Sequence, residues 1–266
     1  DCNEEMNWTK NNVGSDKYIW RCQNKKCPKV KRRVSIRKGS IFMKSHIGFQ
    51  KWIHAIHLWS ERISQTQAVN ELNLSNKTIM DTFKFFREVC TSFFKMNPVK
   101  LGGFDSVVEV DVMCFTNQIK SKCGKSPQES VIALGLVDTS TSPAVSYMEM
   151  VENSDPASLL PIIEKVVKPD SIIHTSDWRE YRKITQTTDL QPRTINNSII
   201  FVDKCTGAHT QTIKNYWNQN KYHLKKMNGC QRNLLPGYLN EYMWFDRFSS
   251  NAFKNVCTHI ATQYPL

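Results

Sequence analysis

A change of pattern after Leu101-Gly102-Gly103 constrains the fold most, because short segments rich in β-branched residues replace the helical periodicity of the preceding chain. Strands are predicted at 107–115, 131–137, 145–151, 171–176 and 194–202, and helices at 156–167, 210–227, 238–246 and 251–262. Three strands followed by alternating helix and strand favour a mixed sheet flanked by helices. An α/β domain is therefore expected over residues 101–266.

Two aspartates stand at positions of this sheet where a carboxylate needs a partner. Asp111 lies among β-branched residues at the centre of the strand at 107–115, and an ionised carboxylate is costly to bury unless it is paired or binds a metal. Asp177 follows the strand at 171–176, and ligands gather at the carboxyl ends of strands in such sheets. If the two strands are neighbours, their carboxylates converge, as a two-metal phosphoryl-transfer site requires. Alternatively, Asp177 caps the following helix and Asp111 faces solvent at a strand edge.

Residues 46–100 show helical spacing and are predicted to form three helices. Apolar residues from Phe49 to Trp59 recur on one helix face, and Ser64 with Gln67 forms the capping box of a second, shorter helix. A tight turn and a cap at Ser75 introduce the third helix. This order predicts a helix-turn-helix-like DNA-binding region with Lys77 as a DNA contact, and an ordinary helical bundle is the alternative.

Residues 1–45 are rich in cysteine and lysine, and they are expected to form short strands and turns around a metal knuckle. The net charge of the chain is +12, which favours a polyanionic partner over a merely soluble basic protein. No stretch approaches the ~20 apolar residues of a membrane span, so no membrane partner is expected. Phosphate contacts are expected, rather than only a solvated face, from the basic residues Lys29, Lys31, Arg32, Arg33, Arg37 and Lys38.

Seven motifs that follow one another along the chain carry a family resemblance. They are Trp20-Arg21-Cys22 with Cys27, residues 35–40, residues 108–111, residues 176–181, residues 196–198 with 201–203, residues 206–210 with Ile213 and Trp217, and residues 238–244. This series resembles the Merlin superfamily of DDE transposases and its bacterial insertion-sequence relatives. The resemblance implies a ribonuclease-H-like catalytic domain, metal-dependent cleavage of DNA at transposon terminal inverted repeats, strand transfer into target DNA, and a homodimer or larger assembly on DNA.

The resemblance also assigns residues to the site. Asp111 and Asp177 match the first two catalytic carboxylates, which hold Mg²⁺ or Mn²⁺ in the family, and Lys221 matches a basic residue that contacts DNA phosphate. The third acidic position is Lys214, whose ammonium cannot ligate Mg²⁺, so the adjacent Asn215 is the candidate third catalytic residue. Val112 also departs from the family, which usually carries Glu there.

The family's N-terminal cysteine pairs imply a zinc-ribbon-like basic module over residues 1–45. Cys2, Cys22 and Cys27 supply three thiolates, and the fourth Zn²⁺ ligand is expected before residue 1, so the ribbon is interpreted as truncated. The alternative is three reduced thiols that bind no metal.

Three functions remain open from the sequence. The first is an active DNA transposase, and the second is a catalytically inactive, domesticated or decayed DNA-binding protein, which Lys214 and Val112 favour. The third is a ribonuclease-H-like nuclease that acts without transposition. The expected location is the nucleus for a eukaryotic chain, and otherwise the cytoplasm with the chromosome.

Overall fold

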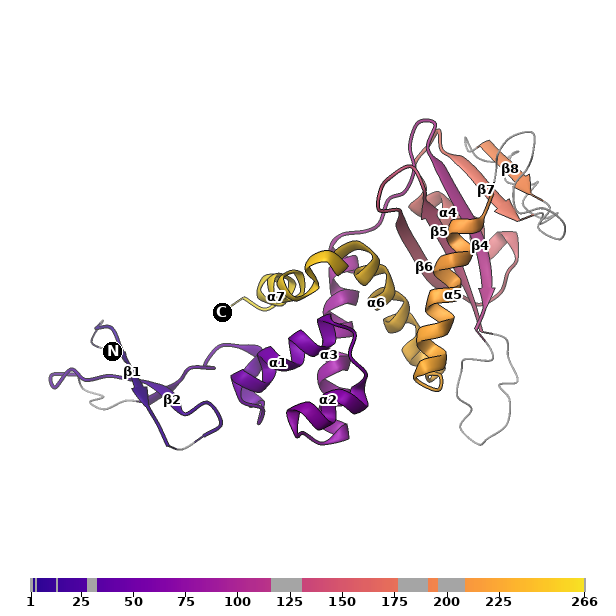
Figure 1. Ribbon diagram of the computed structural model, residues 1–266. Coiled ribbons are helices and arrows are strands. Elements are labelled where there is room, and N and C mark those ends of the chain that lie inside the picture. Colours follow the sequence, from indigo (N-terminus) through magenta and orange to yellow (C-terminus); the bar gives the residue numbers. More distant parts are fainter. Residues whose placement is uncertain are drawn as a thin grey trace. The chain divides into compact units, whose positions relative to one another are not determined.

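The computed structural model describes residues 2, 4–12, 14–27, 33–115, 131–176, 191–195 and 209–265 (Figure 1). Contacts within the chain divide it into two compact units, one of Asp1–Val89 with Ser250–Leu266 and the other of Cys90–Ser249. The predicted domain of residues 101–266 included the last helix of the chain, α7 (Ala252–Gln263), whereas in the structure α7 packs in the same unit as the first helix, α1 (Phe49–Ser60).

The first unit begins with a small antiparallel sheet of three short strands, in the region where short strands and turns were expected. The strands are β1 (Asn7–Lys10), β2 (Tyr18–Arg21) and β3 (Arg33–Ser35), in the order β1-β2-β3. Trp20 of β2 is the direct cross-strand partner of both Trp8 and Val34, so these three side chains lie on one face of the sheet.

The helices of the first unit are α1, α2 (Gln65–Leu72), α7 and the part of α3 (Asn76–Met96) that precedes Cys90. The predicted capping box is confirmed, because Ser64 Oγ accepts from the backbone N–H of Gln67 at 3.3 Å and the Gln67 side chain accepts from the backbone N–H of Ser64. Asn73 ends α2 in the left-handed conformation, with φ of 47°. Ser75 Oγ then accepts from the backbone N–H of Thr78 at 3.1 Å, which confirms the predicted cap of α3.

The second unit is built on a mixed sheet of five strands, which confirms the predicted mixed α/β class. The strand order is β6-β5-β4-β7-β8, with β5 antiparallel to β4 and β6 and with β4, β7 and β8 parallel. Strand β8 begins at Gln191, three residues before the prediction, and the predicted continuation to residue 202 lies outside the described residues. The strands are β4 (Val107–Cys114), β5 (Ile132–Asp138), β6 (Val145–Val151), β7 (Ile172–Ser176) and β8 (Gln191–Ile195).

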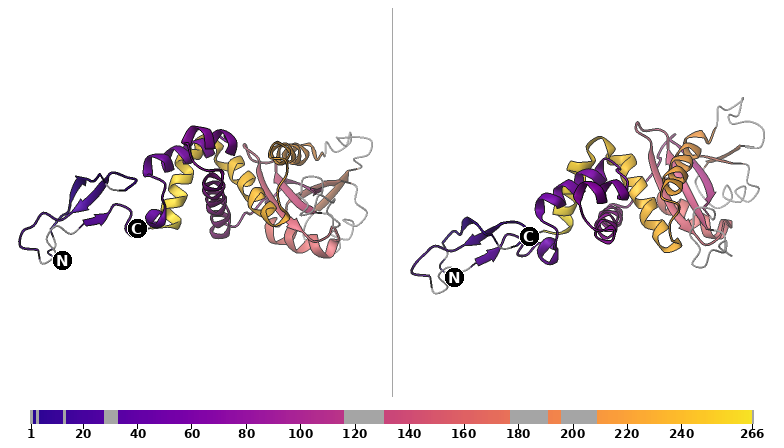
Figure 2. Two further views of the ribbon diagram at one scale, coloured as in Figure 1. Left: turned by 90° about the horizontal axis from the view of Figure 1, so that it is seen from below. Right: turned by 60° about the horizontal axis from the view of Figure 1, so that its bottom comes forward.

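Helices cover both faces of this sheet (Figures 1 and 2). Helix α4 (Pro156–Val166) packs on the face that includes Val108, Val110 and Leu134. Helices α5 (Gln211–Lys226) and α6 (Leu235–Phe248) pack on the other face, against Ala133, Val137 and Met148. The alternation of side chains along β4 and β5 therefore decides which residues meet α5. No helix in the described part of the chain is long and apolar enough to cross a membrane.

Candidate carboxylate site and cysteine cluster

Asp111 lies on the face of the sheet that α5 covers. It is half-buried on β4, directly opposite Gly135 of β5. Its neighbour on the same face of β4 is Glu109, two residues earlier, which is paired with Val137. Val137 and Trp217 of α5 belong to the same buried cluster, so Asp111 faces the layer formed by α5, the helix that carries Lys214.

Gly135 lets α5 approach the sheet beside Asp111. A Cβ atom at this position would lie 2.3 Å from Trp217 Cζ2 and 2.9 Å from Ile213 Cδ1, both in α5. Trp217 and Ile213 are fully buried, so their side chains fill the space that any larger residue at 135 would need. The missing side chain at 135 therefore fixes how closely α5 lies over the strand pair that carries Asp111.

Glu109 joins the beginning of α5 to β4. Its carboxylate is completely buried, and Oε2 accepts from the backbone N–H of Ile213 at 2.8 Å. Ile213 is in the first turn of α5, where backbone N–H groups have no partner within the helix, and Thr210 at the N-cap makes no side-chain cap. The positive end of the helix dipole favours a carboxylate at this place.

His209 is the second partner of this carboxylate. Its Nδ1 lies 3.1 Å from Glu109 Oε1 without the directionality of a hydrogen bond, so the contact becomes an ion pair when the imidazole is protonated. The buried Glu109 thus contacts residues on both sides of the N-cap of α5 and ties this helix start to the strand of Asp111.

Lys214 and Asn215 occupy different sides of α5. Lys214 is half-buried and follows Ile213, one of the residues that face the sheet. Asn215 is exposed, two positions from both Ile213 and Trp217, and its Oδ1 accepts from Gln211 Nε2 at 3.2 Å. Since residues two apart on a helix point in very different directions, Asn215 lies away from the face that covers Asp111.

Strand β7 is the parallel neighbour of β4 on the side opposite β5. The register pairs Glu109 with His174 and Val110 with Thr175, and β7 ends at Ser176. Asp177, the second predicted carboxylate, comes next in the chain and lies outside the described residues. The condition on which the sequence prediction depended, that the two strands are neighbours, is met.

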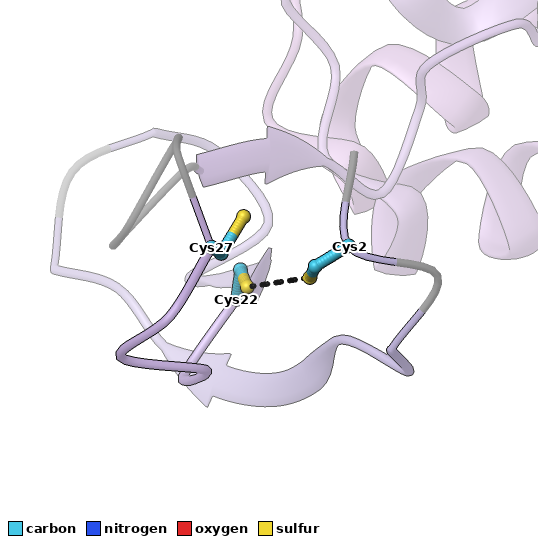
Figure 3. A group of neighbouring side chains, drawn as sticks. All are labelled: Cys2, Cys22 and Cys27. Atoms are coloured by element: carbon cyan, nitrogen blue, oxygen red, sulfur yellow. Dashed lines mark hydrogen bonds between the residues drawn. The ribbon is translucent and has the colours of Figure 1, made fainter.

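The three predicted zinc ligands form a cluster at one end of the β1–β2 hairpin (Figure 3). The Sγ atoms of Cys2, Cys22 and Cys27 all lie within 4.8 Å of one another, and those of Cys2 and Cys22 are 3.8 Å apart. A disulfide requires about 2.05 Å between sulfurs, whereas two thiolates at tetrahedral angles on Zn²⁺, each about 2.3 Å from the metal, are about 3.8 Å apart. The spacing therefore fits a shared metal.

The structure places Arg37, one of the predicted DNA contacts, in the interior of the first unit. Its side chain is buried, Nε and Nη2 donate to the two carboxylate oxygens of Asp16, and Nη2 also donates to the carbonyl oxygen of Ile47 at 2.6 Å. Its guanidinium lies over the ring of Phe49, 5.0 Å from the centroid. This arrangement lowers the pKa of Asp16 below its ordinary value, first because the carboxylate accepts from Arg37. Arg37 is a structural residue of the first unit.

The other predicted DNA contacts differ in accessibility. Arg33, Lys38 and Lys77 are exposed, and Lys221 on α5 is half-buried. Lys77 lies in the first turn of α3, next to the turn at Asn73. The remaining predicted contacts, Lys29, Lys31 and Arg32, lie outside the described residues.

Two residues of this site were not identified from the sequence. Glu109 lies two residues before Asp111 in an otherwise apolar strand, so the sequence already places two carboxylates on the same strand face. This pattern is a signal by which Glu109 could have been identified. Gly135 interrupts the apolar strand β5, and a glycine inside a strand often marks close approach of another element. Only the tertiary structure shows that the element approaching Gly135 is α5.

The second unit matches a known protein family. A family model described as ISXO2-like transposase domain matches residues 100–246, more than half of the chain. An uncharacterized transposase-like protein of Haemophilus influenzae is 36% identical over 109 residues, which cover 41% of this chain and 85% of that protein.

Similarities to solved structures are weaker. A chain of the simian T-cell lymphotropic virus intasome in complex with PP2A regulatory subunit B56 gamma is 14% identical with a TM-score of 0.35, over 72% of this chain and 67% of that one. A chain of a pre-cleavage Mos1 transpososome is 10% identical with a TM-score of 0.28, over 80% and 78%.

The family match and the Haemophilus influenzae relative confirm the expected relationship to DDE-type transposases. The matched residues include β4 with Asp111 and α5 with Lys214. The chain belongs to the family of ISXO2-like transposase domains.

Proposed function

We propose that the chain is a DNA transposase whose second unit is a ribonuclease-H-like catalytic domain, and that Asp111 and Asp177 are its first two catalytic carboxylates. The observation that carries this proposal is that β4, with Asp111, lies beside the parallel strand β7, whose last residue directly precedes Asp177. Three consecutive antiparallel strands with two parallel strands added beside the first are the arrangement expected of a ribonuclease-H-like sheet.

The residues fit a divalent cation such as Mg²⁺ or Mn²⁺. Carboxylate oxygens are preferred ligands of these ions, and Asp111 is only half-buried, so DNA phosphate can reach it. When bound, the metal activates a nucleophile and stabilises the leaving oxygen of the cleaved phosphodiester. The role of this chain is to hold Asp111 on β4 beside β7, the strand that leads to Asp177, and to fix α5 over β4 through Glu109 and Gly135.

The alternative function is a DNA-binding protein without catalysis. It is favoured by Lys214, which stands at the third acidic position of the family on the half-buried side of α5, where an ammonium repels divalent metal. The exposed Asn215, which was predicted as a substitute ligand, points to a different side of the helix. A local rearrangement of α5 is required before Asn215 can take that role.

The first unit is proposed to bind DNA in either case. The α2–α3 segment, with its tight turn at Asn73 and exposed Lys77, supports a helix-turn-helix that reads the transposon ends. The spacing of the Cys2, Cys22 and Cys27 thiols supports Zn²⁺ in a zinc-ribbon-like module, with its fourth ligand unidentified. Assembly as a dimer or larger complex on DNA, and location wherever the chromosome lies, belong to the same proposal.

A DNA-cleavage assay with Mn²⁺ and the element's own terminal repeat tests the catalytic function. It compares the natural chain with Asp111→Ala, Lys214→Glu and Asn215→Ala. Cleavage by the natural chain that is lost in Asp111→Ala supports the transposase, and its further loss in Asn215→Ala supports the predicted third residue. Cleavage by Lys214→Glu alone identifies an intact site inactivated at one position. Retained DNA binding with no cleavage in any variant contradicts the transposase and supports the binding protein.

A further inference from the structure

One face of the N-terminal sheet carries three aromatic side chains that the functions above do not use. Trp8, Tyr18 and Trp20 are 52%, 41% and 37% exposed, although large aromatic side chains are more often buried. Trp8 and Trp20 are direct cross-strand partners, and Tyr18 is two residues before Trp20 on β2, so all three lie on the same face. These three residues form the aromatic face of the sheet.

The rings of the aromatic face contact one another. Trp8 and Tyr18 are stacked with centroids 5.2 Å apart and an interplanar angle of 25°, and Trp8 meets Trp20 edge to face at 5.1 Å. Mutual contacts restrict the side-chain rotamers, so a ligand that stacks on these rings finds them already ordered. The thiols of Cys2 and Cys22 lie beyond the Asn7–Arg21 pair, where a bound metal would hold the two strands together.

The electrostatic surroundings of the aromatic face are strongly basic. Residues 1–45 contain twelve Lys and Arg against four Asp and Glu, a net +8 of the +12 of the whole chain. Lys10 is exposed, pairs with Tyr18 across the strands and therefore lies on the aromatic face itself. Exposed Lys17 precedes Tyr18 in the chain. A cationic ligand or a second copy of this module is repelled by this charge, whereas a polyanion is attracted.

We propose that the aromatic face binds single-stranded nucleic acid, with unpaired bases stacked on Trp8, Tyr18 and Trp20 and with phosphates near Lys10 and Lys17. Exposed rings beside positive charge are the combination that binds single strands without reading their sequence, since every base has a face that stacks. In a duplex the faces of the bases are covered by their neighbours, so rings on a flat sheet gain nothing comparable from it. The site is separate from the carboxylates and goes beyond the proposed cleavage reaction.

The test measures binding of the full chain to a fluorescein-labelled oligo(dT) of about twelve nucleotides and to a duplex of equal length, by fluorescence anisotropy. Loss of one stacked base is expected to weaken oligo(dT) binding about 5- to 150-fold in Trp8→Ala and in Tyr18→Ala. Trp8→Phe, which keeps a ring, is expected to restore most of the affinity. Duplex binding by these variants is expected to stay unchanged.

Two controls isolate the aromatic face. Thr9→Ala changes the opposite face of the same strand, and Phe104→Ala removes an exposed ring, 88% accessible, from the second unit. Both are expected to bind oligo(dT) as the natural chain does. Far-UV circular dichroism confirms that each variant is folded.

Several outcomes overturn the proposal. The first is equal oligo(dT) affinity in the natural chain and in both alanine variants. A second is an equal loss of duplex and oligo(dT) binding, which makes the aromatic face part of a duplex site. A third is tryptophan quenching by anionic phosphatidylserine vesicles but not by oligo(dT), which identifies a membrane surface instead. The cleavage assay with Asp111→Ala is independent of all three, so failure of this proposal is distinguishable from failure of the transposase function.

Discussion

Substitution of Gly135 by alanine tests whether α5 is seated on the sheet as the structure shows. The added Cβ would lie 2.3 Å from Trp217 Cζ2, whereas non-bonded carbons are at their optimum about 3.5–4.0 Å apart. The indole must therefore move by roughly 1.2 Å or more. Gly135 lies in a regular strand and Trp217 is fully buried, so backbone strain does not contribute and the side chain has no free space to enter.

The expected cost is about 1–3 kcal/mol in the free energy of unfolding, the range for overpacked cores. Urea unfolding followed by circular dichroism measures it. Gly237→Ala is the matched control, because nothing lies within 4 Å of a Cβ at 237 in α6, and alanine is the better helix former by up to about 1 kcal/mol. The two glycine-to-alanine substitutions are thus expected to change the free energy of unfolding in opposite directions: Gly135→Ala lowers it and Gly237→Ala raises it.

A double variant identifies the cause of the loss. Trp217→Phe removes the part of the indole that the new Cβ meets, so Gly135→Ala should cost less in that background than in the natural chain, by about 0.5–3 kcal/mol of coupling. Equal stability of Gly135→Ala and the natural chain would refute the reasoning, because it would mean that Trp217 is not packed against Gly135. If the free-energy changes of Gly135→Ala and Trp217→Phe simply add, the stability lost in Gly135→Ala does not come from contact with Trp217.

Three further variants address the buried carboxylate, the buried ion pair and the helix cap. Glu109→Ala leaves the Ile213 N–H without its acceptor and is expected to lower the free energy of unfolding by about 1–3 kcal/mol. Glu109→Gln keeps an acceptor oxygen and should cost less. Equal losses of the two variants in urea unfolding would contradict the capping role of Glu109. Asp16 has a lowered pKa in the folded chain, so its stabilising effect is complete above its unfolded pKa of about 3.9 and is lost as the pH falls through the lower folded value. When the free energy of unfolding is measured as a function of pH, Asp16→Asn should abolish this part of the pH dependence. It should also destabilise the chain near pH 7, because the Arg37 guanidinium stays buried without its carboxylate partner. An unchanged acid profile would contradict a stabilising Asp16–Arg37 ion pair. Ser64→Ala should cost about 0.5–2 kcal/mol in thermal or urea unfolding, and no loss would show that the capping box is not formed in solution.

Periodicity and capping residues located most elements of the fold before any tertiary contact was known. The helix starts at Ser64 and Ser75 are local events, since each cap bonds to backbone only three residues away. The strands of the mixed sheet were recognisable from their β-branched residues, and β6 was predicted with its observed bounds. The start of β8 was misplaced, because Gln191-Pro192-Arg193 carries no strand signal and pairs only through its neighbour β7.

By itself the sequence determined the mixed α/β class, the family, Asp111 as the central carboxylate of its strand and the cysteines that can share a metal. These features follow from residue type and local spacing. Only the tertiary structure decided that Arg37 is buried against Asp16, that Asn215 points away from the sheet, and that three aromatic rings share one exposed face. Strand register and helix packing set these outcomes, and both depend on contacts between residues that are far apart in the chain.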